Sequence, residues 1–249
     1  MKIISKHIDP TSVDYREGCA ILVNKPLNWT SFDVVNKMKF TLKHLYQVKK
    51  IKVGHAGTLD PLATGLLLVC TGKATKQISG LQEMKKAYQA ELKLGATTPS
   101  YDAEYPEENK IDPNHLTTSE IEDVVLSFHG VQDQMPPNFS ALKVDGQPMY
   151  KWTRKGVKKE LKSREITIYN MGINEIRVPH VNFTVECSKG TYIRSIAHDI
   201  GQKLNVGAYL TGLCRLSIGE YENKDACDLE TWVNAMRNIE KKEDVSSAE

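Results

Sequence analysis

The segment from Gly54 to Gly65, GHAGTLDPLATG, surrounds one acid with glycines, and it is the part of the chain best suited to present a reactive group. Its three glycines allow backbone conformations that are closed to other residues. Pro61 pushes Asp60 towards extended backbone, because the residue before a proline avoids the helical region. A carboxylate held on such a loop can attack covalently or take a proton. An aspartate in a turn can also simply cap the loop.

A second glycine-containing segment, Gly72-Lys73-Ala74-Thr75, has the look of a phosphate-binding loop but not its spacing. Six residues separate Gly65 from Gly72, whereas that motif needs four, and Ala74 stands where a Ser or Thr would hold magnesium. We therefore predict that Lys73 is a surface or RNA-contacting lysine at the start of a helix.

Buried strands and a capped helix must position the Asp60 loop. Residues 20–24 (AILVN) and 66–70 (LLLVC) are apolar runs of strand length. Between them, Thr30 or Ser31 is suited to cap a helix. The expected apolar face of this helix recurs at helical spacing and consists of Phe32, Val35, Met38, Leu42 and Leu45.

The rest of the chain mixes strands and helices without regular alternation, which indicates an α+β fold. We expect strands at 88–94, 166–169 and 181–187, helices at 72–81, 117–128 and after Ser188–Thr191, and a long polar loop at 95–115. The predicted organisation is an N-terminal extension (1–18), a catalytic domain (19–230) with a mobile inserted element (132–165), and a helix remnant with a disordered tail (231–249).

Composition sets outer limits on the function. The 249 residues suffice for one large or two small domains with a proper core, and no apolar run reaches the length of a membrane span. The N-terminus lacks the features of a secretory signal. The five cysteines show no metal-ligand spacing, which favours reduced, buried thiols over a zinc site or a thiol nucleophile. We expect a cytoplasmic protein without a metal.

Positive charge is concentrated although the net charge is only +2. The stretch 37–52 holds lysines and no acid, and the stretch 151–164 holds seven basic residues against Glu160. Segregated basic stretches are typical of phosphate binding. A solvated lysine face is the alternative.

The chain resembles the TruB family of tRNA pseudouridine synthases. Gly54–Leu67 resembles the signature loop of that family. Four further blocks follow in family order, and all of them lie within residues 20–216: Lys25-Pro26 with Thr30-Ser31; Lys86–Ala90 with Leu94-Gly95; Pro136–Lys143; and Cys187–Arg194 with Gly207–Leu210.

The resemblance implies a mixed, largely antiparallel pseudouridine-synthase sheet flanked by helices, with an inserted basic element that contacts RNA. It also implies isomerisation of uridine to pseudouridine in the T-loop of tRNA, at position 55 of tRNA numbering. The target base must be extruded from its stack. Nothing is oxidised or lost in this reaction, so no cofactor is expected. The expected partner is the tRNA T-arm, with no membrane, no protein partner and a monomeric state.

Roles for individual residues follow from the resemblance. Asp60 matches the catalytic aspartate, Arg194 the arginine that pairs with it, and Tyr88 the tyrosine that stacks on the target base. His55 matches a histidine that fills space vacated when the RNA loop opens. Further RNA or substrate contacts are implied at the uracil-pocket residues Tyr192 and Leu210 and at the block lysines Lys25 and Lys143.

The sequence also departs from the family pattern. After Gly95, the family shows Thr, Thr, Asp and Gly at spacings that correspond here to Thr98, Ser100, Asp102 and Tyr105. Ser keeps the hydroxyl, whereas Tyr in place of Gly changes the loop backbone. Cys214 precedes Arg215 where many members carry a second basic residue. Residues 220–249 are too few for the PUA domain that many relatives carry, so we expect reduced contacts to the acceptor end of tRNA.

Two alternatives to a tRNA-modifying enzyme stay open. The basic stretches would equally suit a non-catalytic RNA-binding or RNA-folding protein, but such a protein has no need of the acid. Guide-dependent modification of ribosomal RNA, as in dyskerin-like relatives, would call for the C-terminal domain that we do not expect here.

Overall fold

The computed structural model describes residues 1–157 and 159–246. The chain forms two compact units: unit 1 contains Met1–Lys86 and Cys214–Glu249, and unit 2 contains Ala87–Leu213. The region expected to be one catalytic domain, 19–230, is therefore divided between two units. Strand β11 (Ala208–Ile218) contributes to both, since its last five residues, 214–218, belong to unit 1.

Unit 1 is built on the central pair β2 (Cys19–Lys25) and β4 (Ala63–Thr71), which are antiparallel. β1 (Lys2–Ile4) and β13 (Cys227–Asp228) add to β2 in parallel, and β3 (Val53–His55) adds to β4. The expected N-terminal extension thus supplies a strand. The remaining strand of unit 1, β12 (Tyr221–Glu222), pairs with β11.

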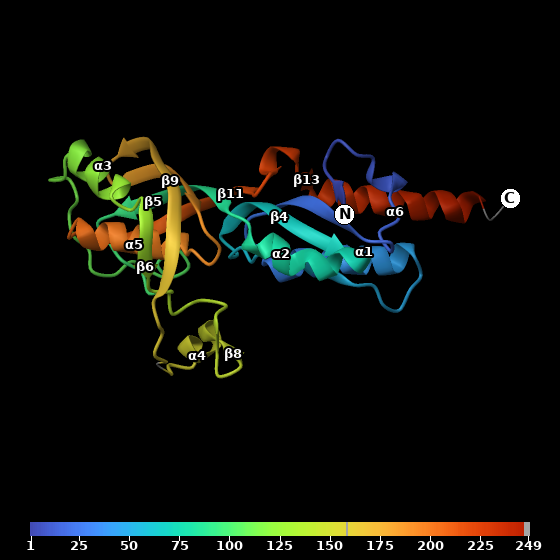
Figure 1. Ribbon diagram of the computed structural model, residues 1–249, viewed down its shortest axis with the longest axis horizontal. Coiled ribbons are helices and arrows are strands. Elements are labelled where there is room, and N and C mark those ends of the chain that lie inside the picture. The colour runs from blue at the N-terminus through green and yellow to red at the C-terminus, as the bar shows by residue number, and fades with distance from the viewer. Residues whose placement is uncertain (158, 247–249) are drawn as a thin grey trace. The chain divides into compact units, whose positions relative to one another are not determined.

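Helices α1 (Ser31–Leu45) and α6 (Leu229–Ser246) contact each other in unit 1, where their apolar side chains share a core with β2 (Figure 1). α6 is longer than expected, because the composition predicts a disordered tail from about residue 238 and the backbone is helical to Ser246. Residues 247–249 of the expected tail lie outside the described residues. The expected helix at 72–81 forms as a 3-10 turn (Gly72–Gln77) followed by α2 (Ile78–Glu83).

The start of α1 follows the sequence signal. Thr30 is the N-cap and forms a capping box with Asp33, in which each side chain accepts from the other residue's backbone amide. The apolar face differs from the prediction at one position: Phe32 is 65% exposed, and Val34 is buried instead. Position 32 lies in the first turn of α1, on the side of the helix that faces solvent.

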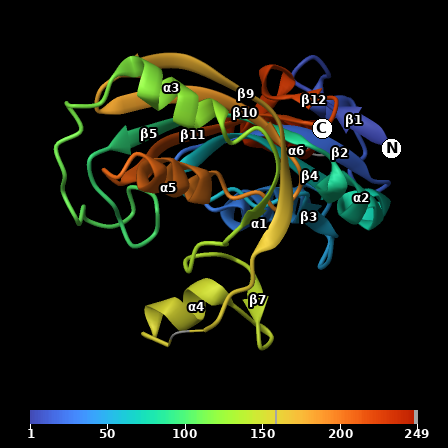
Figure 2. The same cartoon turned by 60° about the vertical axis from the view of Figure 1, so that its left-hand side comes forward.

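Unit 2 orders its strands β11-β5-β10-β9-β6, where β5 is Lys86–Leu94, β6 is Gly130–Gln134, β9 is Arg164–Arg177 and β10 is His180–Cys187. β9 pairs antiparallel with both β10 and β6. Helices α3 (Thr118–Leu126) and α5 (Ile193–Lys203) flank this sheet (Figure 2). The polar segment 95–115 carries no helix and no named strand, as expected.

The expected inserted element, 132–165, begins within β6 and ends within β9. It holds a two-stranded hairpin, β7 (Lys143–Val144) and β8 (Gln147–Pro148), followed by α4 (Met149–Arg154), and both ribbon views draw it away from the sheet of unit 2 (Figures 1 and 2). Lys158 of the second basic stretch lies outside the described residues. No helix within 1–157 and 159–246 is long and apolar enough to cross a membrane.

Candidate active site

The N-terminus of α1 holds one side of the loop that carries Asp60. The hydroxyl of Ser31, which is buried in the first turn, accepts from the amide of Leu59 at 2.8 Å and donates to the carbonyl of Leu59 at 3.1 Å. The amide of Asn28 donates to the carbonyl of Pro61 at 2.9 Å. The residues on either side of Asp60 are therefore bonded to the segment between β2 and α1.

Arg215 of β11 holds the rest of this loop. Its guanidinium donates to the carbonyl oxygens of Leu66 at 2.7 Å, Gly57 at 3.1 Å and, at the long limit, Thr58 at 3.5 Å. The side chain is 1% exposed. We refer to Ser31, Lys25, His55, Asp60 and Arg215 as the Asp60 cluster of unit 1.

Lys25 does not reach outward, which corrects the expectation that it contacts RNA. It is fully buried at the end of β2, and its ammonium donates to the carbonyls of Pro26 at 2.9 Å, Trp29 at 2.5 Å and Pro61 at 3.3 Å. Because an ammonium has three donors, these carbonyls use all of them. Burial lowers the pKa of Lys25 to about 8, against the opposing effect of the Asp60 charge.

His55 ends β3, at the entrance to the same loop. Burial is the main cause that lowers the pKa of its imidazole, and the charge of Arg215 adds to this effect. Within the described part of the chain, its Nδ1 atom is buried without a hydrogen-bond partner. The neutral imidazole is therefore the favoured form near pH 7.

The first turn of α5 carries the corresponding cluster of unit 2. Arg194 is 5% exposed, and its guanidinium donates to the carbonyl of Ser100 at 3.0 Å and to that of Phe139 at 2.9 Å. The carboxylate of Asp102 lies 3.6 Å from the same guanidinium. We refer to Arg194, Ser100, Asp102 and Phe139 as the Arg194 cluster.

The loop at 98–105, where the sequence departs from the family pattern, is well bonded. The hydroxyl of Ser100 donates to the carboxylate of Asp102 at 2.5 Å, so serine keeps the function that a hydroxyl can supply there. The backbone of Asp102 forms an isolated β-bridge with Leu210 of β11. Tyr105 packs against the ring of Phe139, with the centroids 4.8 Å apart. The tyrosine that replaces a family glycine thus contacts a residue held by Arg194.

The two expected walls of a uracil pocket also lie in unit 2. Leu210 is buried in β11, and Tyr192 is the half-buried N-cap of α5. The side-chain amide of Gln134 bonds both backbone groups of Tyr192, at 3.0 and 2.8 Å. Tyr88 is 8% exposed in β5. The structure thus places Tyr88, Tyr192, Arg194 and Leu210 in unit 2.

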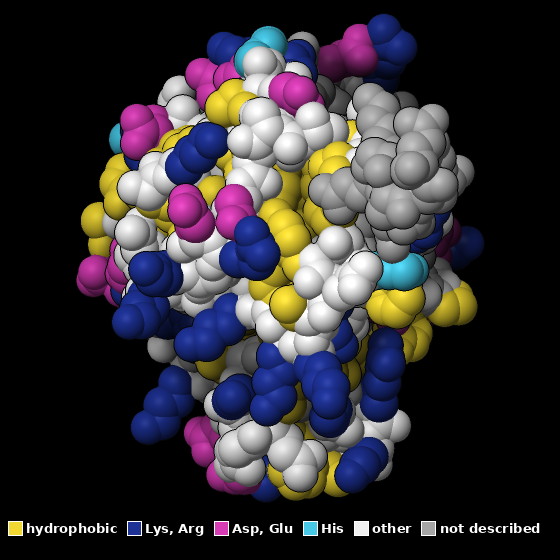
Figure 3. All heavy atoms as spheres, turned by 90° about the vertical axis from the view of Figure 1, so that its right-hand side faces the viewer, with side chains coloured by type: hydrophobic (Ala, Val, Ile, Leu, Met, Phe, Trp, Pro, Cys, Tyr) yellow, Lys and Arg dark blue, Asp and Glu magenta, His cyan; other side chains and the backbone are white. Residues whose placement is uncertain are grey.

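The other predicted RNA contacts are on the surface. Lys73, in the 3-10 turn after β4, and Lys143, in β7, are exposed. Lysine and arginine side chains gather in the lower part of the face drawn in Figure 3. Trp152 in the inserted element lies beneath the ammonium of Lys159, 4.8 Å from its ring centroid. Such pairs of aromatic and basic groups suit nucleic-acid binding.

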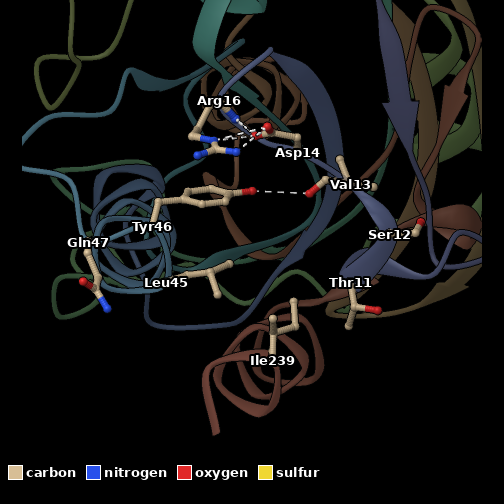
Figure 4. A pocket seen from close by; sticks show the side chains of 9 residues that line it. All are labelled: Thr11, Ser12, Val13, Asp14, Arg16, Leu45, Tyr46, Gln47 and Ile239. Carbon is tan, nitrogen blue, oxygen red and sulfur yellow. Dashed lines mark hydrogen bonds and ion pairs between the residues drawn. The ribbon is translucent and has the colours of Figure 1, made fainter. Parts of the chain in front are cut away.

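A hollow of about 570 Å³ lies elsewhere in unit 1, against the end of α1 and against Ile239 of α6 (Figure 4). Its wall includes Tyr46, whose hydroxyl is directed at the carbonyl of Val13 at 3.3 Å, and Arg16, whose guanidinium is paired with Asp14 at 2.7 Å. None of the residues predicted to act on RNA lines this hollow.

Sequence reasoning misses the role of Arg215, which stands out only as the neighbour of Cys214. No pattern predicts a strand at 208–218, so nothing indicates that a side chain from this segment turns inward. A lone arginine beside apolar residues, in the stretch AYLTGLCRLSI, is the available signal.

The sequence is similar to known proteins of one family. Residues 43–193 match a family model described as TruB family pseudouridylate synthase (N terminal domain). The chain is 47% identical over 228 residues to tRNA pseudouridine synthase B of Flavobacterium johnsoniae, with 91% of this chain and all of that protein covered. It is 50% identical to tRNA pseudouridine synthase B of Parabacteroides distasonis, with 84% of this chain and 88% of that protein covered.

Solved structures show the same fold. A chain from an H/ACA RNP bound to a substrate RNA containing 2'-deoxyuridine matches with a TM-score of 0.64 at 26% identity over 91% of this chain. A chain from a Cbf5-Nop10-Gar1 complex matches with a TM-score of 0.65 at 27% identity over the same share. The present chain covers only 57% and 58% of those longer chains. The expected mixed, largely antiparallel sheet flanked by helices is confirmed.

Proposed function

Since this chain belongs to the TruB family of pseudouridine synthases, we propose that it isomerises uridine to pseudouridine in the T-loop of tRNA, with Asp60 as the catalytic carboxylate. The target is position 55 of tRNA numbering. The observation that carries the assignment of Asp60 is the fixation of its loop, whose backbone is bonded to α1, to Lys25 and to Arg215. Rigid presentation of one acid is what a reacting carboxylate needs.

The reaction balances without a cofactor. The bond from ribose C1′ to the uracil nitrogen breaks, the base turns, and C1′ rejoins the ring through carbon, after which a proton leaves that carbon and one is gained at nitrogen. Asp60 acts either by attacking covalently or by removing a sugar proton. Both routes need the ionised carboxylate, and the positive charge of Lys25, which interacts with the charge of Asp60, favours that form.

The residues of unit 2 are proposed to serve the base and the reacting charge. Tyr88 stacks on the flipped uracil, and Tyr192 with Leu210 encloses it. Arg194 supports the charge of the reacting carboxylate, as the family resemblance implies. Its burial and its bonds to two loop carbonyls support a fixed position for this guanidinium. His55, neutral in its buried place, is proposed to fill space left by the opened RNA loop.

Substrate contacts are proposed to come mainly from loop shape and phosphates. The basic stretches at 37–52 and 151–164, together with Lys73 and Lys143, supply the positive charge. We also propose that the protein acts as a monomer in the cytoplasm. Lys25 is not included among the RNA contacts, because its ammonium is bound by backbone carbonyls.

The deciding experiment incubates unmodified tRNA with the purified protein and no other component, and then maps pseudouridine at single-nucleotide resolution. We expect one modified site in the T-loop, and none with Asp60→Asn, which removes the charge at nearly constant shape. The Asn variant should keep much of its RNA affinity. Binding without modification by the wild-type protein would establish the alternative, a non-catalytic RNA-binding protein, and near-normal turnover by the Asn variant would refute the role of Asp60.

A further inference from the structure

Arg215 is a buried cation whose guanidinium donates to main-chain oxygens of the segment around Asp60. Gly57 and Thr58 precede Asp60 in the chain, and Leu66 follows it in β4. One planar guanidinium therefore spans both ends of the loop. A rigid fork of donors is what distinguishes arginine from lysine in such a place.

Two glycines of the loop, both with positive φ, lie against Arg215. Gly65 has φ +98°, and a Cβ there would lie 2.4 Å from the carbonyl oxygen of Arg215, so only glycine lets the two backbones approach. Gly57 has φ +96°, and a Cβ there would lie 3.5 Å from Nη1 of the guanidinium. Gly65 therefore permits close packing against the backbone of Arg215, whereas at Gly57 there is room for a Cβ and the positive φ is what favours glycine.

The charge of Arg215 also acts on the other ionisable groups of the cluster. It contributes to lowering the pKa of His55 and that of Lys25. Asp60 acts on Lys25 in the opposite sense, which places the acid within the same set of interacting charges. Removal of the guanidinium would therefore change both the shape of the loop and the electrostatic surroundings of the carboxylate.

We propose that Arg215 is a positioning residue for the reaction, which holds the Asp60 loop by its carbonyl oxygens on both sides of the reacting carboxylate. This inference rests on the proposed role of Asp60. Because its side chain is only 1% exposed, Arg215 acts through the loop that it holds. Its effect should therefore appear in the chemical step rather than in RNA binding.

The test measures kcat and KM separately for Arg215→Lys and Arg215→Met on unmodified tRNA. We expect kcat to fall about tenfold for the lysine variant and at least about a hundredfold for the methionine variant, with KM within about threefold of wild type. Lysine keeps the charge but lacks the planar fork of donors that spans the two ends of this loop, so it should restore part of the rate. The exposed Arg16→Lys is the matched control and should leave both parameters unchanged.

A pH profile separates positioning from a purely structural role. In Arg215→Met the acidic limb of the pH profile of kcat should move to higher pH, because the ionised carboxylate of Asp60 loses a cation from its cluster. A loss of activity that only follows the fraction of folded protein, with an unmoved acidic limb, would overturn the proposal. So would a normal kcat in both variants.

A second variant keeps the proposal testable if Arg215→Met does not fold. Gly57→Ala leaves the arginine in place but strains the backbone where its Nη2 atom bonds the loop. It should lower kcat with little change in KM, and an unchanged kcat would contradict the proposal. Asp60→Asn is assayed in parallel: if it is active, the proposed function of Asp60 fails, whereas an inactive Asn variant beside fully active Arg215 variants overturns only the present inference.

Discussion

The Asp60 cluster of unit 1 and the Arg194 cluster of unit 2 both bind a buried cation to backbone carbonyls, but with the roles reversed. In unit 1 the acid proposed to react, Asp60, sits on a loop, and the cations Lys25 and Arg215 reach that loop from neighbouring strands. In unit 2 the group with a proposed role is the cation Arg194. It sits on a helix, and loop carbonyls reach it.

The two clusters also differ in how the buried charge is balanced. Arg194 has the carboxylate of Asp102 at 3.6 Å, and Asp102 is itself bonded by Ser100. Arg215 instead donates to the carbonyl oxygens of Gly57, Thr58 and Leu66. Carbonyl oxygens carry only a partial negative charge, so they do not neutralise the guanidinium of Arg215. Its positive charge can therefore still act on the loop. The comparison teaches that unit 1 uses its buried cations to fix the backbone of a loop, whereas unit 2 uses loop carbonyls and a buried carboxylate to fix the side chain of one cation.

The largest effect is expected from breaking the Arg194 cluster. Arg194→Gln leaves the carbonyls of Ser100 and Phe139 without their donor and Asp102 without its cation. Removal of one partner from a buried pair costs about 3–5 kcal/mol of stability, and we expect kcat/KM to fall by more than about a hundredfold. Chemical unfolding and initial rates measure both effects.

The control for this variant is Arg177→Gln, because Arg177 is an exposed arginine in β9 of the same unit. Arg194→Lys should be intermediate in stability, since it keeps the charge and loses the fork. A Gln variant with wild-type stability and rate would show that the cluster is dispensable.

A smaller effect is expected from Lys25→Met in unit 1. The variant removes the donor to three carbonyls, including that of Pro61, and should destabilise the protein by about 1–3 kcal/mol at pH 7. The pH dependence has a defined sign. The pKa of Lys25 is lowered from 10.5 to about 8 in the folded protein, so between these values the unfolded chain binds more protons and wild-type stability rises with pH.

The stability difference between wild type and Lys25→Met should therefore widen from pH 8 to pH 10.5, by on the order of 2–3 kcal/mol, and stay constant below pH 8. Urea unfolding of both proteins across this range measures it. A constant difference across the whole range would mean that the ammonium is not held as described.

The parts of the fold that follow local rules could be predicted from the sequence. The capping box at Thr30, the strand runs at 20–24 and 66–70 and the alternation in 181–187 are all encoded by neighbouring residues, and each of these elements forms where expected. The strand expected at 166–169 is longer than its local pattern indicates, because β9 runs from Arg164 to Arg177. β11 escapes prediction because Thr211, Gly212 and Cys214 interrupt its apolar pattern, and pairing within the sheet rather than local periodicity defines it.

The site divides in the same way. Asp60 stands out because its glycines and proline are adjacent in sequence. Lys25 is expected among the RNA contacts because a lysine is normally exposed, and only the fold shows that Pro26, Trp29 and Pro61 bring their carbonyls to its ammonium. Arg215 is distant in sequence from the loop that it holds, so no spacing rule connects the two. Tertiary hydrogen bonds of a charged side chain are invisible to local patterns.

A further prediction compares the basic stretches of the two units. We expect Lys39→Gln with Lys43→Gln in unit 1, and Lys151→Gln with Lys155→Gln in unit 2, each to lower the salt dependence of tRNA binding. The slope of log affinity against log salt should decrease by about 0.7–0.9 for each phosphate that the variant no longer neutralises. Filter binding at several salt concentrations measures it.

The control for the salt experiment is Lys224→Gln, which removes an exposed lysine outside both stretches. If only one double variant changes the slope, only that unit binds phosphates. A slope unchanged in both would remove the case for the two basic stretches as RNA-binding surfaces.

The smallest effect concerns an acid on the same helix as Arg194. Asp199 lies on α5, and burial raises the pKa of its carboxyl from 3.8 to about 6, although Lys203 opposes the shift. An acid whose folded-state pKa is raised adds stability that is full below pH 3.8 and lost as the pH rises through 6. At pH 7 the ionised Asp199 therefore destabilises the fold, in contrast to Arg194, whose charge is paired with that of Asp102.

We expect Asp199→Asn to stabilise the protein by about 1 kcal/mol at pH 7, after allowance for partial exposure. This gain should shrink towards zero as the pH falls from 6 to 4, whereas the exposed Asp123→Asn on α3 should show no such dependence. Urea unfolding at pH 7 and pH 4.5 separates the outcomes. If Asp199→Asn is less stable than wild type at pH 7, the ionised carboxylate contributes favourable contacts to α5, and unit 2 would then be stabilised by the half-buried charge of Asp199 as well as by the buried pair Arg194 and Asp102.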